Sequence, residues 1–229
     1  MPYEHVILPD VSQLSIGILG GTGAQGRGLG YRWARAGHRV TLGSRDARRA
    51  HDAATGLAAM LAPDAAIAGT DNETACDNDI VLVAVPWEGH RELLTGLADA
   101  LRDRIVIDCV NPLGFDSKGP YALPVAEGSA AQQAEQILPR SRVTAAFHHV
   151  SAVTLADPDV DTVDTDVMVL GDDREAATTV QALAGRIDGV RGIYAGRLRN
   201  AAQVEAMTAN LIAINRRYKA HAGLRVSNL

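Results

Sequence analysis

Short apolar runs alternate with amphipathic segments along most of this chain. The apolar runs predict buried strands at residues 15–19, 38–43, 66–69, 80–85, 105–110 and 142–147. The amphipathic segments between them predict helices at residues 29–36, 46–61, 87–101 and 128–138. Because this alternation is typical of βα units, we expect an α/β fold with a doubly wound, mostly parallel sheet.

An acidic stretch at residues 157–166 separates this pattern from the rest of the chain. Beyond it the pattern predicts two more strands and two more helices, at residues 167–170, 192–194, 174–187 and 200–221. We therefore expect an N-terminal extension, a main domain and a smaller C-terminal α/β domain that ends in a long helix, at residues 1–14, 15–155 and 156–229.

A glycine-rich turn joins the first predicted strand to the first predicted helix. Gly21, Gly23 and Gly26 match the pattern Gly-x-Gly-x-x-Gly in the strand–turn–helix context that this motif requires. We expect the first glycine to permit the tight turn, the second to let the backbone approach a pyrophosphate, and the third to let helix pack on strand. The N–H groups at the helix start can then bind phosphate oxygens. Residues 15–155 are therefore predicted to form a Rossmann-type dinucleotide-binding domain.

The end of the second predicted strand indicates which dinucleotide is bound. Folds that bind NAD usually place a carboxylate there to accept the ribose hydroxyls, whereas Ser44 and Arg45 come first in this chain. Their hydroxyl and guanidinium can bind a 2′-phosphate, with Arg48 or Arg49 as a second cation. This favours NADP, although a shift of one residue would put Asp46 in the carboxylate position.

Composition excludes several classes of function. The chain of 229 residues is 47% hydrophobic, and its formal net charge of −5 argues against general nucleic-acid binding. Residues 1–13 hold no long apolar run, so we expect neither a signal peptide nor a membrane partner. Cys76 and Cys109 are the two cysteines and belong to no His/Cys cluster with ligand spacing, so we expect no disulfide, no metal and a cytoplasmic location.

Several polar residues lie near predicted strand ends. The Gly/Pro-rich segment 111–119 is predicted to be a loop at the carboxyl end of the strand 105–110, where ligands of open α/β sheets bind. Asp108 and Asn111 could contact a ligand there. We interpret Glu88 and His90, which follow Pro86, as residues of the first helical turn rather than as catalytic groups.

Three short motifs together resemble the NADPH:coenzyme F420 oxidoreductase family. They are Leu-Gly-Gly-Thr-Gly-Ala-Gln-Gly at 19–26, Gly-Ser-Arg at 43–45 and Val-Pro-Trp-Glu at 85–88, in the family's order and spacing. The resemblance continues through Phe-His-His-Val-Ser-Ala at 147–152, Gly-Asp-Asp at 171–173 and Arg-Leu-x-Asn at 197–200. It therefore covers the chain from residue 15 to the C-terminus.

The resemblance implies reversible, direct hydride transfer between NADP(H) and coenzyme F420, an 8-hydroxy-5-deazaflavin that acts as co-substrate. Because the chemistry resides in the two cofactors, the protein has to align two carbon atoms about 3–3.5 Å apart and keep water out. We therefore expect no essential general acid or base of the dehydrogenase kind.

The resemblance also implies a set of cofactor-binding residues. Those at the phosphate-binding turn and the 2′-phosphate are Gly21, Thr22, Gly23, Ala24, Gln25, Ser44, Arg45 and Arg49. Those near the adenosine and the nicotinamide are Val85, Trp87, Leu113 and Ala152. Those against the deazaflavin are His148, Val150, Ser151 and, near its tail, Leu224, for which Gly223 is the alternative. Related sequences often carry proline at the position of Ser151, so the pocket floor is expected to differ here.

His148 is the one candidate catalytic residue. It could donate a hydrogen bond to the deazaflavin ring and stabilise negative charge on the reduced pyrimidine portion, and the ordinary pKa of histidine near neutrality suits that role. The alternative is a structural histidine that caps the end of a strand.

The C-terminal segment is rich in cations. They are Arg186, Arg191, Arg197, Arg199, Arg216, Arg217, Lys219 and Arg225, with Asp188 and Glu205 as the acidic residues among them. We expect a local basic surface whose arginines bind the phosphodiester and glutamates of the F420 tail. A solvated helix face or an oligomer contact is the alternative.

Two other functions remain open. A reductase of a small imine or carbonyl that uses NADP would need a large helical dimerisation domain, or a catalytic Lys or His–acid pair, and the segment after Asp157 is short for such a domain. A non-catalytic redox sensor would bind NADPH and turn over no acceptor. In each case we expect a homodimer or a higher homo-oligomer, because symmetric assemblies of this kind are the commonest.

Overall fold

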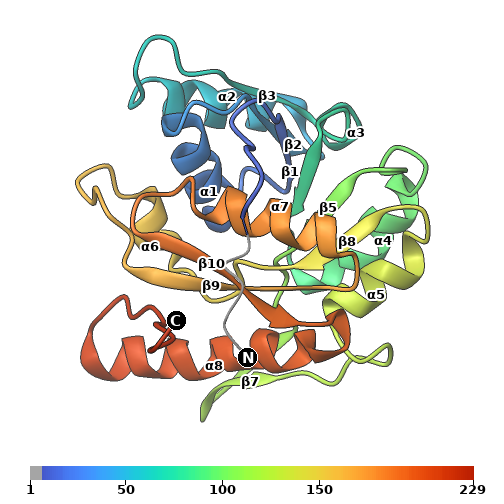
Figure 1. Cartoon of the computed structure of the whole chain (residues 1–229), viewed down its shortest axis with the longest axis vertical. Helices are drawn as coiled ribbons and strands as arrows, with labels where there is room; N and C mark the ends of the chain where they lie inside the picture. The colour runs from blue at the N-terminus through green and yellow to red at the C-terminus, as the bar shows by residue number, and fades with distance from the viewer. Residues whose placement is uncertain (1–6) are drawn as a thin grey trace.

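Eight strands form one twisted sheet in the computed structural model, which describes residues 7–229 (Figure 1). They follow the order β10-β9-β8-β5-β4-β1-β2-β3 across the sheet. Their bounds are β1 (Ile16–Leu19), β2 (Val40–Ser44), β3 (Ile67–Asp71), β4 (Ile80–Val83), β5 (Ile105–Asp108), β8 (Arg142–Ala145), β9 (Thr165–Gly171) and β10 (Val190–Gly196). The first six are parallel, whereas β9 runs antiparallel to β8 and pairs in parallel with β10. The predicted α/β class with a mostly parallel sheet is confirmed.

Helices cover both faces of this sheet, as the strand residues require. Alternate residues of the inner strands point to opposite faces, so that Ile80 and Leu82 join one apolar cluster and Val81 and Val83 the other. The first cluster also takes residues from α1 (Ala24–Arg35), α2 (Ala47–Ala58), α6 (Ala152–Ala156) and α7 (Arg174–Ala184). The second takes residues from α3 (Asn72–Ala75), α4 (Trp87–Leu97), α5 (Ala130–Ile137) and the start of α8 (Ala201–Tyr218).

Side-chain caps fix where several of these helices begin. Asp46 accepts hydrogen bonds from the N–H groups of Arg48 and Arg49 at the start of α2. Ser129 caps α5 and Asp173 caps α7 in the same way. Each cap satisfies N–H groups that have no partner inside the helix, so these short polar residues determine the helix starts.

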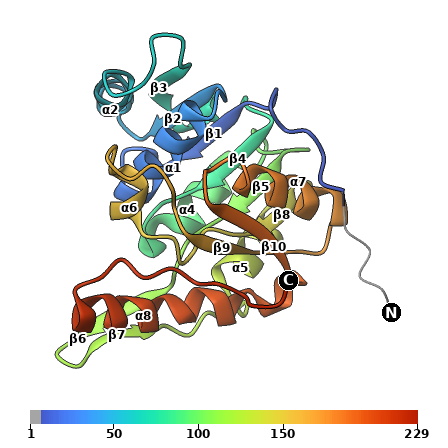
Figure 2. The ribbon, with the colours of Figure 1, turned by 60° about the vertical axis from the view of Figure 1, so that its left-hand side comes forward.

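The Gly/Pro-rich segment that follows β5 is a hairpin rather than the predicted loop 111–119. Its strands β6 (Leu113–Asp116) and β7 (Gly119–Ala122) pair in antiparallel register. Figure 2 shows the hairpin beside α8, and β7 contacts that helix. The prediction was wrong because the hairpin depends on α8, which comes some eighty residues later in the chain.

The C-terminal third of the chain extends the same sheet. The predicted strands 167–170 and 192–194 are parts of β9 and β10, and the predicted division after residue 155 falls inside α6. The assignment of residues 156–229 to a separate smaller domain stays a prediction. Residues 1–6 of the predicted extension 1–14 lie outside the described residues. In the described part of the chain, none of the helices combines the length and hydropathy that a membrane span needs.

Candidate active site

The direction in which the chain winds identifies one edge of the sheet as the ligand site. From β1 the chain proceeds to β2 and β3 on one side, and it then returns to β4 and β5 on the other. In doubly wound sheets, ligands bind outside the carboxyl ends of the strands at such a switch point. The segments that follow the strands at this edge are 20–23, 45–46, 84–86, 109–112 and 146–151, which hold or adjoin most of the predicted site residues.

The turn after β1 depends on Gly20 more than on Gly21, contrary to our expectation. Gly20 has a φ of +73°, a conformation that favours glycine, whereas Gly21 has no positive φ. A Cβ at Gly20 would also lie 2.6 Å from the carbonyl oxygen of Ala84 and 2.7 Å from Cγ1 of Val85. The tight turn is therefore made one residue earlier than the motif suggests, and it brings Val85 against the turn.

The start of α1 is open, as a phosphate site requires. Its N-cap residue is Gly23, and within residues 7–229 no side chain caps the N–H groups of the first turn. A Cβ at Gly26 would lie 2.9 Å from Cα of Gly21 and 3.0 Å from the carbonyl oxygen of Gly20. The absence of a side chain there lets the helix start pack closely on the turn, so that its uncapped N–H groups and the positive end of its dipole face this edge.

At the end of β2, Asp46 is occupied by the helix that follows. Its carboxylate caps α2 by accepting hydrogen bonds from N–H groups in the first turn of that helix. Ser44 is buried and accepts a hydrogen bond from the Asp46 N–H, while the side chains of Arg45 and Arg49 are exposed. In residues 7–229, neither guanidinium forms a hydrogen bond or ion pair. The two cations are therefore available to an anion.

Asn72 supports the turn from a neighbouring loop, and our sequence reasoning missed it. This buried residue begins α3, directly after β3, and its side-chain oxygen accepts a hydrogen bond from the Gly20 N–H at 3.4 Å. The same oxygen lies 2.9 Å from where a Cβ at Gly43 would be. An asparagine after a strand carries no signal that distinguishes this role from an ordinary helix cap.

The loop after β8 is attached to the dinucleotide turn. Phe147 has a φ of +66° and is fully buried, with its ring edge-on to that of Trp33 at 5.4 Å between centroids. The side-chain amide of Gln25 donates a hydrogen bond to the Phe147 carbonyl at 3.1 Å. The structure thus joins Gln25, predicted at the phosphate-binding turn, to the loop that carries the predicted deazaflavin residues.

His148 and His149 are buried next to each other in this loop. Among residues 7–229, neither ring nitrogen of His148 has a hydrogen-bond partner, and Nδ1 of His149 also lacks one. Burial lowers the pKa of each imidazole to about 4, and His148 adds to the effect on His149. We expected a pKa of His148 near neutrality, but this ring is neutral at pH 7 and has one N–H to donate.

Other predicted residues follow His148 in the loop. Val150 is buried, Ser151 caps α6 by accepting a hydrogen bond from the Thr154 N–H, and Ala152 begins that helix. α6 packs so closely on α1 that a Cβ at Gly28 would lie 2.7 Å from Cβ of Leu155. The position of Ser151 is therefore set by helix packing.

The exit from β5 holds the backbone of His148 from the other side. Asn111 donates a hydrogen bond from its side-chain amide to the His148 carbonyl at 2.9 Å, and Thr208 of α8 donates a second one at 3.0 Å. Leu113, a predicted nicotinamide contact, begins β6 two residues later. Asn111 thus binds the loop rather than standing free for a ligand.

The C-terminal tail carries Leu224 to the start of β9. The Leu224 N–H donates to Oγ1 of Thr165, and the Leu224 carbonyl accepts from the Asp166 N–H at 2.7 Å. Asp166 is 1% exposed and its carboxylate accepts from Arg191 at both oxygens, from Arg225 and from the Val226 N–H. These bonds hold the pKa of Asp166 far below its usual range.

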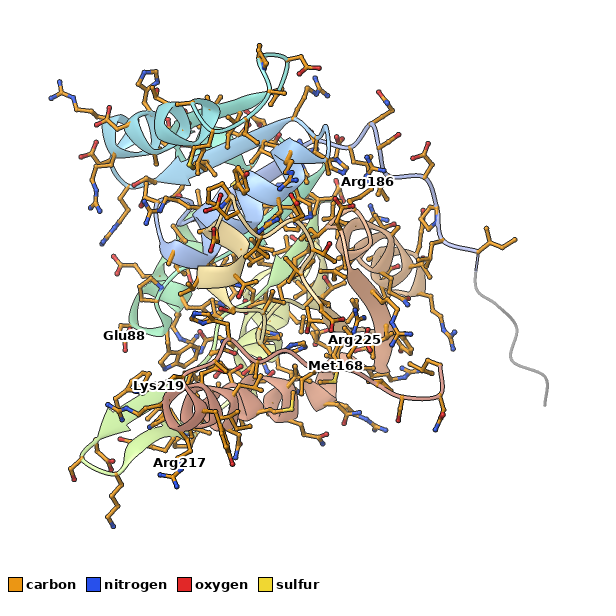
Figure 3. All side chains as sticks on the ribbon, turned by 90° about the vertical axis from the view of Figure 1, so that its left-hand side faces the viewer. Glu88, Met168, Arg186, Arg217, Lys219 and Arg225 are labelled. Carbon is orange, nitrogen blue, oxygen red and sulfur yellow. The ribbon has the colours of Figure 1, made fainter. Side chains whose placement is uncertain are left out.

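The predicted basic surface does not form as one patch. Arg191 and Arg225 pair with Asp166, and Arg197 pairs with Asp172, because the sheet brings acidic residues from other segments beside them. Figure 3 shows Arg186 in the upper half of the view, well separated from Arg217, which extends from α8 away from the sheet. Glu205, counted as a neighbour of these cations, is buried and binds the N–H groups at the start of α5.

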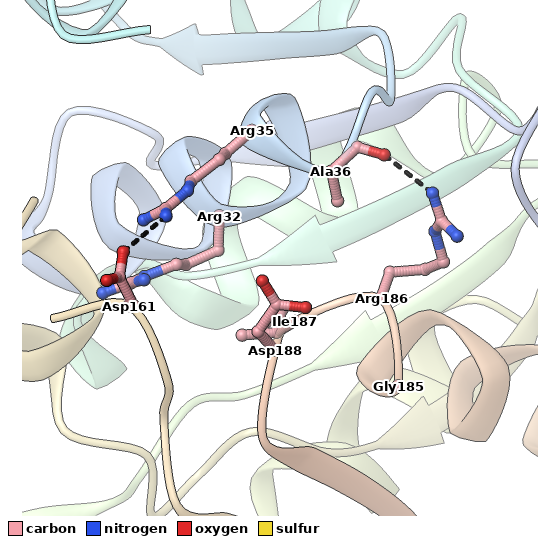
Figure 4. Close-up of a pocket in the computed structure, with 8 residues that line it drawn as sticks. All are labelled: Arg32, Arg35, Ala36, Asp161, Gly185, Arg186, Ile187 and Asp188. Carbon is pink, nitrogen blue, oxygen red and sulfur yellow. Dashed lines mark hydrogen bonds and ion pairs between the residues drawn. The ribbon is translucent and has the colours of Figure 1, made fainter.

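Arg186 lines a polar pocket of about 230 Å³ that lies away from the candidate site (Figure 4). The pocket adjoins the C-terminal end of α1, whereas the dinucleotide turn is at the N-terminal end of that helix. Arg35 is paired there with Asp161, and the guanidinium of Arg32 donates to four backbone carbonyls. Arg32 and Arg35 thus already have partners within the protein.

Two kinds of comparison bear on the class of protein. A structure of pyrroline-5-carboxylate reductase from Coxiella burnetii superposes with a TM-score of 0.60 over 90% of this chain and 67% of that one, at 13% identity, which shows the shared fold. A structure described as an F420-dependent NADP reductase from Arthrobacter sp. FB24 superposes with a TM-score of 0.78 at 25% identity, over 94% of this chain and all of that one. Fold and site thus define a Rossmann-type dinucleotide-binding protein of the reductase class.

The sequence comparisons make this assignment specific. The family model for F420-dependent NADP oxidoreductases matches residues 15–112. The F420-dependent NADP reductase of Methanothermobacter thermautotrophicus is 37% identical over 96% of this chain and 97% of its own length. That of Methanocaldococcus jannaschii is 36% identical over 94% and 99%. The chain belongs to the F420-dependent NADP reductase family, and the expected resemblance is confirmed.

Proposed function

We propose that this protein catalyses reversible hydride transfer between NADP(H) and coenzyme F420. The observation that carries the proposal is the attachment of the loop 146–151 to the open dinucleotide turn by the hydrogen bond from Gln25 to the Phe147 carbonyl. This bond fixes the loop that is expected to face the deazaflavin relative to the turn that is expected to hold NADP. Two cofactors that exchange a hydride need such a fixed relative position.

NADP is bound along the switch-point edge in this proposal. The uncapped N–H groups at the start of α1 take the pyrophosphate, through residues Gly21, Thr22, Gly23, Ala24 and Gln25. The 2′-phosphate is bound by Ser44, Arg45 and Arg49. Asp46 repels it little, because its carboxylate accepts hydrogen bonds from N–H groups at the start of α2. Val85, Trp87, Leu113 and Ala152 flank the adenosine and nicotinamide.

F420 is bound against the loop after β8. His148, Val150 and Ser151 face its ring system, and the tail residue Leu224 lies near the other end of the coenzyme. His148 is a neutral imidazole in the folded protein, and its two buried nitrogens have no hydrogen-bond partner in the part of the chain that the structure describes. A buried donor without a partner is costly, so a ligand that accepts its N–H would satisfy it.

The protein contributes position and exclusion of water. The hydride passes directly between the two bound coenzymes, so none of these side chains has to accept or donate a proton during the transfer. Packing of Phe147 on Trp33 fixes the backbone at the bend that precedes His148. Rigid support of this kind matters because a misplacement of about 1 Å can cost about 100-fold in rate.

The reductase of a small imine or carbonyl is less well supported. One of the arrangements expected of such an enzyme is a His–acid pair that a substrate can reach. His90 and Asp108 do form such a pair, at 2.6 Å, but both side chains are 0% exposed.

We also propose that the protein is a cytoplasmic homodimer. The buried thiols of Cys76 and Cys109 are unpaired, which is typical of proteins in a reducing compartment.

Purified protein mixed with NADPH and oxidised F420 tests this proposal. We expect rapid loss of the visible absorbance of the deazaflavin with NADPH and much slower loss with NADH. When FMN or FAD replaces F420, we expect no loss of the flavin absorbance. Tight NADPH binding without turnover of F420 would contradict the proposal and favour the sensor. Failure to bind NADPH at all would contradict the site as well.

A further inference from the structure

A chain of buried polar groups runs beneath the candidate site, between elements that are distant in sequence. Its centre is His90 of α4, whose side chain is 0% exposed. Asp108 at the end of β5 lies on one side of the ring and Gln133 of α5 on the other. His90 is thus more than the first-turn helix residue that we expected, since it links a strand to two helices.

Hydrogen-bond geometry determines how many protons this imidazole carries. Nε2 of His90 lies 2.6 Å from Oδ2 of Asp108, and Nδ1 lies 2.9 Å from Oε1 of Gln133. The Gln133 amide is oriented by its other end, because its NH₂ group donates to Glu127 at 3.2 Å, and Glu127 is also paired with Arg91. Both partners of His90 are therefore acceptors, whereas a neutral imidazole has a single N–H.

The surrounding charges favour the protonated ring. Burial by itself lowers the pKa of His90, but the Asp108 carboxylate and the hydrogen bonds to Asp108 and Gln133 more than offset it, so that the pKa lies above the ordinary value. Glu205 of α8 adds a further acidic group on this side. Burial raises the pKa of Glu205 to about 7, with His90 acting in the opposite direction. Beyond Gln133, the next charged groups of the network are Glu127 and its partner Arg91.

Two connections lead from His90 to the candidate site. The ring of Trp87 lies over that of His90, with 5.6 Å between centroids and a tilt of 30°. On the other side, Oδ1 of Asp108 accepts a hydrogen bond from the Val110 N–H at 3.0 Å, at the exit from β5. The next residue, Asn111, holds the carbonyl of His148.

We infer that His90 is a buried imidazolium that acts as a positioning residue, holding Trp87 and, through Asp108 and Asn111, the backbone of His148 in place for hydride transfer. The inference rests on the proposed function. His90 itself touches neither reacting carbon atom in this account. Its positive charge keeps Asp108 in the orientation that fixes the strand exit, because the buried carboxylate would otherwise lose its charged partner.

The proton count can be measured without any ligand. In an ¹⁵N-correlated NMR spectrum of the histidine side chains at pH 8, we expect His90 to show both ring nitrogens protonated. The signal is assigned by its loss in His90→Gln. His51→Gln is the matched control, because His51 is exposed on α2, away from this network. A His90 ring with one protonated nitrogen would overturn the inference.

The positioning role has two readouts. In His90→Gln we expect the indole N–H resonance of Trp87 to shift or broaden, and kcat to fall by about 10-fold to 100-fold, more than the KM for F420 changes. The wild-type kcat should decline as the pH is raised through the pKa of His90, and the variant should lack this decline. His51→Gln should leave both readouts unchanged.

The results separate this inference from the proposed function. A wild-type protein without turnover of F420 would contradict the function, and the Trp87 resonance would then decide the positioning role alone. An unchanged indole N–H resonance of Trp87 in a folded His90→Gln variant would overturn that role. If wild type does turn over F420, a variant with kcat within about twofold of wild type, at unchanged fold, would overturn it too.

Discussion

Replacement of Arg45 by alanine should separate the two nicotinamide dinucleotides. Arg45 follows the last residue of β2, and its side chain is exposed. Within residues 7–229 it forms no hydrogen bond and no ion pair. The substitution therefore removes no hydrogen bond or ion pair inside the described part of the protein, and we expect the free energy of unfolding to change by less than about 0.5 kcal/mol. Whatever the variant loses in binding can then be assigned to the ligand.

The expected loss follows from the contact that the guanidinium is predicted to make. A hydrogen bond to a charged group contributes about 1.5–3 kcal/mol. Because Arg45 remains open to water, we expect the lower part of this range, about 1.5–2 kcal/mol, which is roughly a 10- to 30-fold increase in the Kd for NADPH. NADH lacks the 2′-phosphate, so its Kd should change by less than about twofold.

Calorimetric titration with NADPH and NADH measures both constants directly. Arg39→Ala is the matched control, because Arg39 is exposed and lies before β2, at the opposite end of that strand from Arg45. It should leave both Kd values unchanged. Equal losses for NADPH and NADH in Arg45→Ala, or an unchanged Kd for NADPH, would refute the assignment of Arg45 to the 2′-phosphate.

Two further predictions concern stability. Burial lowers the pKa of His148 and of His149 to about 4 in the folded protein. At a pH below the ordinary pKa of histidine, the unfolded chain therefore binds more protons than the folded one. The free energy of unfolding should therefore fall as the pH drops from about 6.5 to about 4, by up to about 3 kcal/mol per histidine, and urea unfolding of His149→Gln should show a weaker pH dependence. Asp166→Asn should speed hydrogen exchange in the C-terminal tail and lower the free energy of unfolding by about 1–3 kcal/mol. The control Asp159→Asn, at an exposed carboxylate of the same acidic stretch that forms no hydrogen bond or ion pair within residues 7–229, should do neither.

The dinucleotide turn shows how far local sequence patterns reach. The spacing of its glycines indicated a strand, a turn and an open helix start, and all three are present. The residue with positive φ is nevertheless Gly20 rather than Gly21. The spacing could not reveal this, because the constraint at Gly20 includes the carbonyl of Ala84, which follows β4, some sixty residues later in the chain.

The roles of the histidines were beyond the reach of the sequence. The residues around His148 indicated a loop near a ligand, but the low pKa of this ring results from burial by the assembled elements. The position of His90 after Pro86 suggested an ordinary first helical turn. Its partners Asp108 and Gln133 come from other elements, so a pattern within one segment cannot predict these hydrogen bonds.

The sequence by itself determined the α/β class, the switch-point turn and the family, because apolar periodicity and short motifs act within one or two neighbouring elements. The tertiary structure decided which charges are paired and which polar groups are buried. Arg191 and Arg225 seemed part of a basic surface until β9 placed Asp166 between them. The protonation of His90, likewise, follows from contacts that form only when a strand and two helices pack together, since burial and charge pairing depend on neighbours in space.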